Sequence, residues 1–495
     1  MKPDASGSTN SLPRVLGPWM AAALVVGTVI GSGVFKKPQT VAERVPEFGP
    51  AMLVWILGGT LALLGALALA EIAVLIPRAG GNYAFLKAGY GRLFGFLWGW
   101  VEFWIIRSAS IASLAVMFVE GLNDVLRQSL QQSEVLSFWS KQLTAVGVIL
   151  GLGALNMLGT VLGGRVQVVL TTIKIGSILG IIALPWLILA FVASPENPPK
   201  LENLGRFWPE SISASYLGNF GAALVGVLWA YHGWMNIGPV AEEVREPQKN
   251  IPRALLGGVL LLIVIYLGAN VSYYLVIPQT EMKDVKNTAV STEFALRLLG
   301  PVGAILGSGV LMMSVFGSLN GNLLVGPRLL FAMARDRLAP EALVRVNAST
   351  QTPMAAGVVL AGWSALMVAG AAAMREVTLP TLELEGLTLD INVPADKSTF
   401  DILTDFAMFG AVAFETLVIV SLFVFRRRYP VSEVKLPYRC PGYPIVPALY
   451  ALIMAAVLVN MFATPDQRSQ AFVGVGFMLV GLLVYRLFAP KSDVA

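Results

Sequence analysis

The chain has 495 residues, of which 56% are hydrophobic and only 13% charged, and its mean hydropathy is +0.71. This composition predicts a polytopic membrane protein embedded in a lipid bilayer. The net charge of +5 is modest and spread over loops, so it gives no reason to expect nucleic acid as a partner. Cys440 is the only cysteine, which excludes an intrachain disulfide and a thiol-based metal site. No metal or cofactor is expected.

Twelve apolar segments follow one another along the chain, each long enough to cross a bilayer core about 30 Å thick. They are expected at about 17–45, 51–76, 93–122, 141–158, 166–192, 216–243, 254–277, 302–334, 353–373, 402–425, 445–462 and 472–487. Residues 1–16 form a short tail without a signal peptide. Lys and Arg concentrate in alternate loops, including the run 426–428, which predicts that both termini are cytoplasmic. We expect a multi-pass protein of the plasma membrane, the inner membrane in a bacterium.

The first apolar segment contains an interruption at residues 26–34, which read VGTVIGSGV. Gly31 and Gly33 each cost about 1 kcal/mol of helix propensity relative to Ala. Two short helices that meet at Gly31-Ser32-Gly33 would leave unpaired N–H groups at the start of the second helix, where an anion such as a carboxylate binds well. Close helix packing through small residues is the alternative interpretation.

A second interruption lies five spans later, where residues 228–239 read LWAYHGWMNIGP. A histidine, an asparagine and a Gly-Pro pair in the middle of a span are poor helix material. Paired interruptions at matching positions predict an inverted-repeat transporter with its binding site near the membrane midplane. The repeats are expected at 17–193 and 216–425, and residues 443–488 would add the last two spans. Because five is an odd number, the second repeat must enter the membrane with the opposite polarity.

Several motifs resemble one family. Residues 27–35 (GTVIGSGVF) resemble the first-helix motif of the amino acid–polyamine–organocation (APC) superfamily, and 229–234 (WAYHGW) with 242–253 (EEVREPQKNIPR) are similar to its L-type amino acid transporters. Residues 102–107 (EFWIIR) and 316–322 (FGSLNGN) fit the same family, so the resemblance covers most of 15–440. It implies an all-α fold of 12 transmembrane helices with a 5+5 inverted repeat (the LeuT-type fold), in which helices 1 and 6 are broken. It also implies amino acid transport, commonly by sodium-independent exchange.

The two interruptions supply the expected substrate site. Amides of residues 32–34 would hold the substrate carboxylate, and carbonyls freed near 29–30 and 229–230 would take its ammonium group. Backbone recognition of a zwitterion explains why no charged pair is needed there. The residues predicted to bind a small L-amino acid are Val29, Ile30, Gly31, Ser32, Gly33, Val34, Trp229, Ala230, His232 and Gly233.

Two aromatic residues of the second interruption carry further expectations. The resemblance implies that Trp229 is an aromatic gate over the substrate, whereas packing in the bundle core is the alternative. His232 stands where relatives tend to carry Gly or an acid, and it is either a pocket residue or a hydrogen-bonded structural one. If it lines the pocket, its bulk and the lack of an acid there favour neutral amino acids of small or middling size.

Lys174 is a charge within the fifth span. Snorkelling to the membrane surface is one interpretation. In similar transporters, however, a lysine at this position puts its ammonium where sodium-coupled relatives hold sodium, bridging spans one and eight. Ser314 would be its counterpart in span eight, and Glu102 its carboxylate partner. A fixed cation would remove the need for sodium, and a titrating lysine could instead couple transport to protons.

The remaining features bear on gating and on competing functions. Glu242 and Glu243 form either an inner gate with Arg328 or Arg335, or a solvated loop. Cys440 falls on the cytoplasmic side, so no disulfide-linked heavy chain is expected. The chain has no His-Glu-x-x-His or Gly-x-Ser-x-Gly motif, so we expect no enzyme. The sequence predicts sodium-independent exchange of neutral L-amino acids by alternating access. Proton or sodium symport, transport of cationic amino acids or polyamines, and amino acid sensing stay open.

Overall fold

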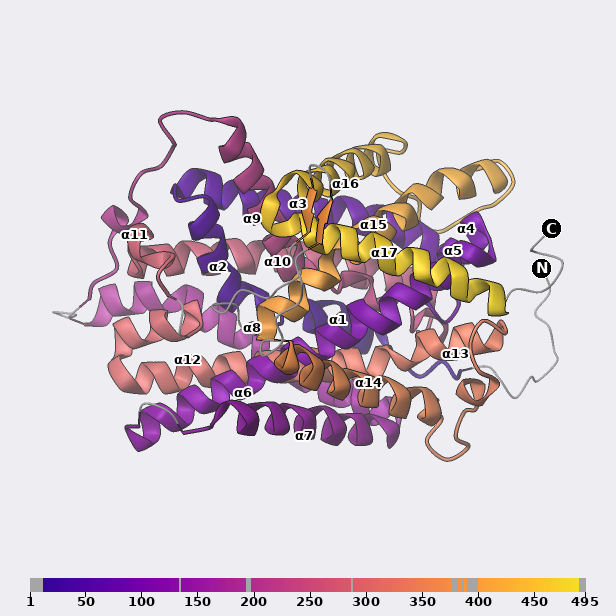
Figure 1. The fold of residues 1–495 in the computed structure, drawn as a ribbon, viewed down its shortest axis with the longest axis horizontal. Helices are drawn as coiled ribbons and strands as arrows, with labels where there is room; N and C mark the ends of the chain where they lie inside the picture. The colour runs from indigo at the N-terminus through magenta and orange to yellow at the C-terminus, as the bar shows by residue number, and fades with distance from the viewer. Residues whose placement is uncertain are drawn as a thin grey trace.

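A computed structural model describes residues 12–132, 135–192, 197–285, 288–374, 382–384, 387–389 and 399–488. The long helices lie side by side in one bundle (Figure 1). Helices α4 (Asn82–Tyr90), α5 (Arg92–Val101) and α13 (Pro327–Arg335) lie at one end of the bundle, which we call the α13 end. Helices α2 (Gly33–Arg44) and α11 (Gln279–Met282) lie at the opposite end, which we call the α2 end.

The predicted first half of the chain forms five spans. They are α1 (Pro18–Val29) with α2, α3 (Phe48–Leu75), α5 continuing through the π-helix η1 (Glu102–Arg107) into α6 (Ser108–Leu130), α7 (Phe138–Met157), and α8 (Thr160–Phe191). The first span lies in the centre of the bundle, because 78% of its most apolar window is buried, against 28% for α7 and for α8.

The second half begins with α9 (Ala214–Tyr231), which is followed by the 3₁₀ turns η3 (Trp234–Ile237) and η4 (Ala241–Glu243). The later spans are α10 (Pro247–Val276), α12 (Val290–Val325) with α13, α14 (Met354–Ala373), α15 (Thr399–Arg428), α16 (Ile445–Ala463) and α17 (Pro465–Phe488). Short connecting elements are η2 (Leu201–Leu204), η5 (Glu341–Val344) and the antiparallel pair β1 (Leu382–Leu384) and β2 (Leu387–Leu389).

Eleven helical stretches of the described chain are long and apolar enough to cross a membrane. The predicted sixth span is not among them, because its interruption ends α9 at Tyr231. The eighth span begins close to the predicted residue 302. Within α12 two helices meet at Gly300, which is not helical (φ 65°, ψ −154°). The segment before Gly300 folds back on the segment after it, since the hydroxyls of Thr292 and Ser308 lie 3.0 Å apart. Positive φ costs little at a glycine, so Gly300 can make this reversal.

The first span is broken where the sequence predicts. Helix α1 ends at Val29, Ile30 leaves the helix with φ −69° and ψ 82°, and α2 begins at Gly33. Gly33 also packs closely on α9, because a Cβ built there would lie 2.4 Å from the Cα of Ala230. The two interpretations of these glycines, a break and close packing, therefore both hold at this point.

The sixth span is broken at His232 and Gly233. His232 is extended, with ψ 144°, and Gly233 adopts φ 112°, a conformation that glycine alone adopts readily. The Thr28 hydroxyl, in the last turn of α1, donates a hydrogen bond to the Gly233 carbonyl at 3.1 Å. The two interruptions therefore touch each other in the centre of the bundle.

Candidate functional site

A cavity of about 350 Å³ lies between the two interruptions. Its lining includes Val29, Gly31, Ser32, Gly33, Trp229, His232 and Gly233 from the predicted set. Ile30, Val34 and Ala230 are not lining residues, since their side chains are buried in the surrounding core. Ser110, Asn236 and Asn322, which come from three different spans, add polar groups to the wall. The described residues contain no cluster of His, Cys, Asp and Glu that could hold a metal ion.

The start of α2 faces this cavity with hydrogen-bond donors. The first N–H groups of a helix have no acceptor within it, and Gly33 and Val34 are the first two residues of α2. The Ser32 hydroxyl precedes them, is buried, and has no hydrogen-bond partner within the described chain. A buried hydroxyl without a partner is costly, so an acceptor supplied by a ligand would be stabilised here. A carboxylate also benefits from the positive end of the helix dipole.

Donors from the chain surround the carbonyls freed by the first interruption. The Ile30 oxygen lies 2.7 Å from Lys174 Nζ, 2.7 Å from Ser318 Oγ and 3.0 Å from Ser314 Oγ. The Val29 oxygen accepts from the Gly31 amide at 2.7 Å and from the Tyr266 hydroxyl at 3.0 Å. A carbonyl has two lone pairs, so the Val29 oxygen already has a donor for each.

Trp229 lines the cavity and belongs to an aromatic cluster. Its ring lies parallel to the His232 ring, with centroids 6.0 Å apart, and edge-on to Phe400 of α15 at 6.4 Å. Lys36 and Lys37 of α2 lie over the Phe400 ring, 5.1 Å and 5.4 Å from its centroid. This cluster joins the wall of the cavity to side chains of α2 and α15.

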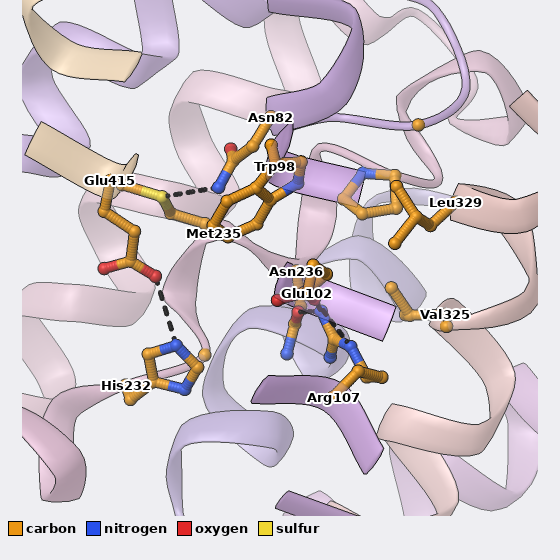
Figure 2. A pocket seen from close by; sticks show the side chains of 14 residues that line it. Asn82, Trp98, Glu102, Arg107, His232, Met235, Asn236, Val325, Leu329 and Glu415 are labelled. Atoms are coloured by element: carbon orange, nitrogen blue, oxygen red, sulfur yellow. Dashed lines mark hydrogen bonds and ion pairs between the residues drawn. The ribbon is translucent and has the colours of Figure 1, made fainter. Parts of the chain in front are cut away.

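His232 lines the cavity, which answers the question that the sequence left open. Its Nε2 atom lies 3.1 Å from Oε1 of Glu415, which comes from α15 (Figure 2). The lining of this cavity contains no acid, but a carboxylate that the sequence analysis did not foresee lies directly beside the His232 ring. Glu415 was missed because α15 is otherwise an apolar span, and nothing in its sequence indicates which of its faces meets the interrupted helix.

Lys174 lies where the sequence predicts. It is 1% exposed, and its ammonium donates to the Gly27 and Ile30 carbonyls, both at 2.7 Å, and to Ser318 Oγ at 2.9 Å. The ammonium thus bridges the first and eighth spans and does not snorkel. Ser314 binds the Ile30 and Gly31 carbonyls at 3.0 Å and 3.1 Å rather than the lysine. Ser318, one helical turn further along, is the direct contact that the sequence analysis missed.

Glu102 is not the partner of Lys174, and that prediction is wrong. Its carboxylate accepts from Arg107 at 2.9 Å from Nε and 2.5 Å from Nη2. The reason is the π-helix η1, whose i→i+5 hydrogen bonds place residues five apart on one face. Arg107 also donates to Asn236 Oδ1 at 2.7 Å and Asn322 Oδ1 at 2.5 Å, and so ties three spans together.

A second cavity, of about 420 Å³, adjoins the first and is shown in Figure 2. Both cavities are lined by His232, Gly233 and Asn236, while Asn82 and Glu415 line only the second of these two. Because Gly80 and Asn82, which precede and begin α4, form part of its wall, the second cavity lies toward the α13 end.

The α13 end is closed by two ion pairs. Arg328 Nε lies 2.8 Å from Glu243 Oε1, with both side chains buried, and Arg335 lies 3.2 Å from Glu242 with both partly exposed. Leu16 adds backbone bonds of 2.9 Å to the Glu243 carbonyl and from the Arg245 amide. The predicted contacts of the two glutamates are therefore confirmed, and Glu243 is not in a solvated loop.

A central cavity between two interrupted spans is the arrangement of inverted-repeat membrane transporters. Residues 16–485 match the amino acid permease family, and the chain belongs to this family of amino acid transporters within the APC superfamily. Its fold is accordingly the all-α, LeuT-type fold of a multi-pass membrane protein, as the sequence predicts.

Curated relatives match over almost the whole chain. The serine/threonine exchanger SteT of Bacillus subtilis is 31% identical over 96% of this chain and 97% of its own. The human b(0,+)-type amino acid transporter 1 is 28% identical over 97% of this chain and 89% of its own length. The human cystine/glutamate transporter is 27% identical, with 94% and 83% covered. These relatives are transporters and not enzymes, in agreement with the absence of catalytic motifs.

Proposed function

We propose that the protein exchanges neutral L-amino acids across the plasma membrane by alternating access and without sodium. The observation that carries this proposal is the cavity at the two interruptions, where the buried Ser32 hydroxyl has no partner beside the first N–H groups of α2. A carboxylate placed there gains donors and the helix dipole together. The substrate ammonium is proposed to lie in the same cavity, toward the end of α9 at Trp229, which forms part of the wall.

Independence from sodium rests on Lys174. Its ammonium occupies the position between the first and eighth spans where, by the family resemblance, coupled relatives hold sodium, and it satisfies two carbonyls and a hydroxyl there. A sodium ion would have to displace a covalently attached cation. Exchange is supported by the serine/threonine exchanger among the relatives.

The α13 end is proposed to face the cytoplasm. Basic side chains gather there, as the positive-inside rule requires of cytoplasmic loops. They include Arg78, Lys87, Arg92, Arg328, Arg335 and Arg337. In this orientation Glu243 and Arg328 close the structure toward the cytoplasm. The proposed inverted repeats comprise residues 17–193 and 216–425. Cys440 is buried, so we propose that no disulfide-linked heavy chain is needed.

Counterflow in proteoliposomes tests this function. Purified protein is reconstituted with an unlabelled amino acid inside, and uptake of labelled alanine, serine, leucine, lysine and glutamate is measured with and without sodium and with and without a pH gradient. We expect uptake of neutral amino acids only when the inside is preloaded, unchanged by sodium. Uptake that requires sodium, or the absence of any amino acid uptake, would contradict the proposal.

Proton symport is the second candidate, and it is favoured by one observation. Lys174 is a fully buried amine without an acidic partner among the described residues, and such a group is the type that gains and loses a proton readily. The pH-gradient arm of the same experiment distinguishes the two functions, because symport drives accumulation into empty liposomes and exchange does not.

A further inference from the structure

We propose that the second cavity recognises the substrate side chain through His232, Glu415 and Asn82, and that the preferred substrates carry a short neutral side chain ending in a hydroxyl or a carboxamide. This inference rests on the proposed function, since it assumes that the main-chain atoms of an amino acid occupy the first cavity. The two cavities share His232, Gly233 and Asn236, so a side chain leaving the first cavity can enter the second without crossing a wall of other residues.

Glu415 determines what the His232 ring presents to the cavity. Its carboxylate lies 3.1 Å from Nε2, so a protonated His232 ring is the charged partner that this buried carboxylate needs. Both ring nitrogens of an imidazolium are donors, and Nδ1 makes no hydrogen bond with any residue that the structure describes. The parallel stack on Trp229 holds the ring in this plane. The result is an oriented donor at the junction of the two cavities.

Asn82 supplies an acceptor in the same cavity. It is 5% exposed, and its Oδ1 atom is buried without a hydrogen-bond partner in the described chain. Its Nδ2 donates only to the Sδ atom of Met235, at 3.1 Å, and a thioether is a weak acceptor. Figure 2 shows this amide and His232 in the wall of one cavity. A donor and an acceptor without partners favour a ligand group that both donates and accepts hydrogen bonds.

The charges around the cavity select for a neutral group. Glu415 of α15 is paired with His232, and Glu102 is paired with Arg107 within η1. The guanidinium of Arg107 is further occupied by Asn236 and Asn322. A cationic or anionic substrate side chain would add an unpaired charge to this set, whereas a hydroxyl or a carboxamide can donate without doing so. An aliphatic side chain would leave Asn82 Oδ1 and the Nδ1–H group of His232 without partners, which a polar site disfavours strongly.

Competition in proteoliposomes tests this inference. The KM values for serine, asparagine, alanine, leucine and lysine are measured for the wild type, for Glu415→Gln and for Asn82→Ala. We expect the wild type to have lower KM for serine and asparagine than for leucine and lysine. A glutamine carries no charge to balance a protonated His232, so the Nδ1–H donor is no longer maintained, and the ratio of the serine KM to the alanine KM should rise by about fivefold or more.

Glu341→Gln, an acid exposed on η5, is the matched control and should leave this ratio unchanged. A ratio that changes by less than about twofold in both cavity variants would overturn the inference, as would equal or better transport of leucine or lysine by the wild type. If Glu415→Gln does not fold, as judged by size exclusion and thermal unfolding, Asn82→Ala decides alone. If alanine and leucine are transported as effectively as serine, this inference alone is overturned. If no neutral amino acid is taken up at all, the proposed function is overturned.

Discussion

At the scale of single residues, Lys174 has the most consequential environment. Its ammonium is the common donor for two carbonyls freed by the interruption of the first span. Gly317 of α12 leaves room for it, because a Cβ there would lie 2.5 Å from Cε of the lysine. The lysine thus holds the two halves of the proposed transport unit together at the point where the first helix is broken.

Replacing Lys174 by Ala should reduce exchange at least about tenfold, equivalent to about 1.4 kcal/mol, because buried carbonyls lose their donor and α1 loses its tie to α12. Counterflow of labelled serine at equal protein density measures the effect. Lys200→Ala, which removes an exposed lysine, is the control and should retain wild-type rates. Full activity of Lys174→Ala would show that the ammonium is dispensable.

Cys440 should resist alkylation in the folded protein. Burial raises the pKa of its thiol to about 12, with a smaller contribution from the nearby Glu71 carboxylate. Only the thiolate reacts, so at pH 8 its population is roughly a thousandfold lower than that of a free cysteine. We expect labelling by a maleimide to be slow in detergent at pH 8 and fast after unfolding, as measured by mass shift. Rapid labelling of the folded protein would contradict this environment.

Single residues could be placed from the sequence where only their position along an apolar span matters, and not where their contacts depend on how two spans pack. Lys174 was placed correctly because its position along the fifth span is fixed by the apolar segment around it. Glu102 was paired wrongly because the π-helix rotates it toward Arg107, and no composition pattern reveals a π-helix. Glu415 could not be found, since its contact with His232 depends on how α15 packs against the interrupted sixth span.

At the scale of elements, the interruption of the first span makes two different demands on its glycines. A Cβ at Gly33 would lie 2.4 Å from the Ala230 Cα, a backbone atom that cannot move aside. A Cβ at Gly31 would meet only side-chain atoms, the nearest at 3.4 Å, which is an ordinary contact. Glycine propensity alone marks both residues equally, so only the structure distinguishes the packing glycine from the tolerant one.

Gly33→Ala should therefore displace the start of α2 from α9 and lower serine exchange by about tenfold or more, whereas Gly31→Ala should retain most activity. The pair is matched, since each variant adds one methyl group two residues apart in the same interruption. Exchange rates and thermal unfolding in detergent measure both effects. Equal losses in the two variants would mean that backbone freedom, and not the contact with Ala230, is what this segment needs.

The existence of both interruptions and of nearly every span could be predicted, because apolar length and misplaced glycine, proline and polar residues are local signals. Short elements outside the apolar runs were not predicted. The part of α12 before Gly300 folds back against the start of the eighth span, where the Thr292 and Ser308 hydroxyls lie 3.0 Å apart, and such packing leaves no signal in hydropathy. The second part of the sixth span is two 3₁₀ turns instead of an α-helix, which periodicity also does not show.

At the scale of the whole molecule, the two cavities share His232, Gly233 and Asn236, and the second lies toward the α13 end. The buried Glu243–Arg328 pair lies at the same end, where Glu242 and Arg335 line a further pocket. These two ion pairs are the proposed closure of the α13 end. A transporter must break such a closure in its other state, so these ion pairs set the balance between the two states.

Glu243→Gln should shift this balance toward the state that is open at the α13 end. Arg328 is 2% exposed and would lose its only acidic partner among the described residues, so the closed state is destabilised by about 3–5 kcal/mol, while the open state hydrates the guanidinium. Val325 lines the second cavity, and a Val325→Cys reporter can be labelled selectively because Cys440 is buried.

With a membrane-impermeant maleimide applied from the α13 side, we expect the reporter to react about tenfold faster or more in Glu243→Gln than in the parent protein. Glu242→Gln is the matched control, because Arg335 is partly exposed, and its pair should contribute less than about 1 kcal/mol. Its labelling rate should therefore rise by a smaller factor. Identical rates in the parent and in Glu243→Gln would mean that the closure depends on the backbone bonds of Leu16 and not on the buried ion pair.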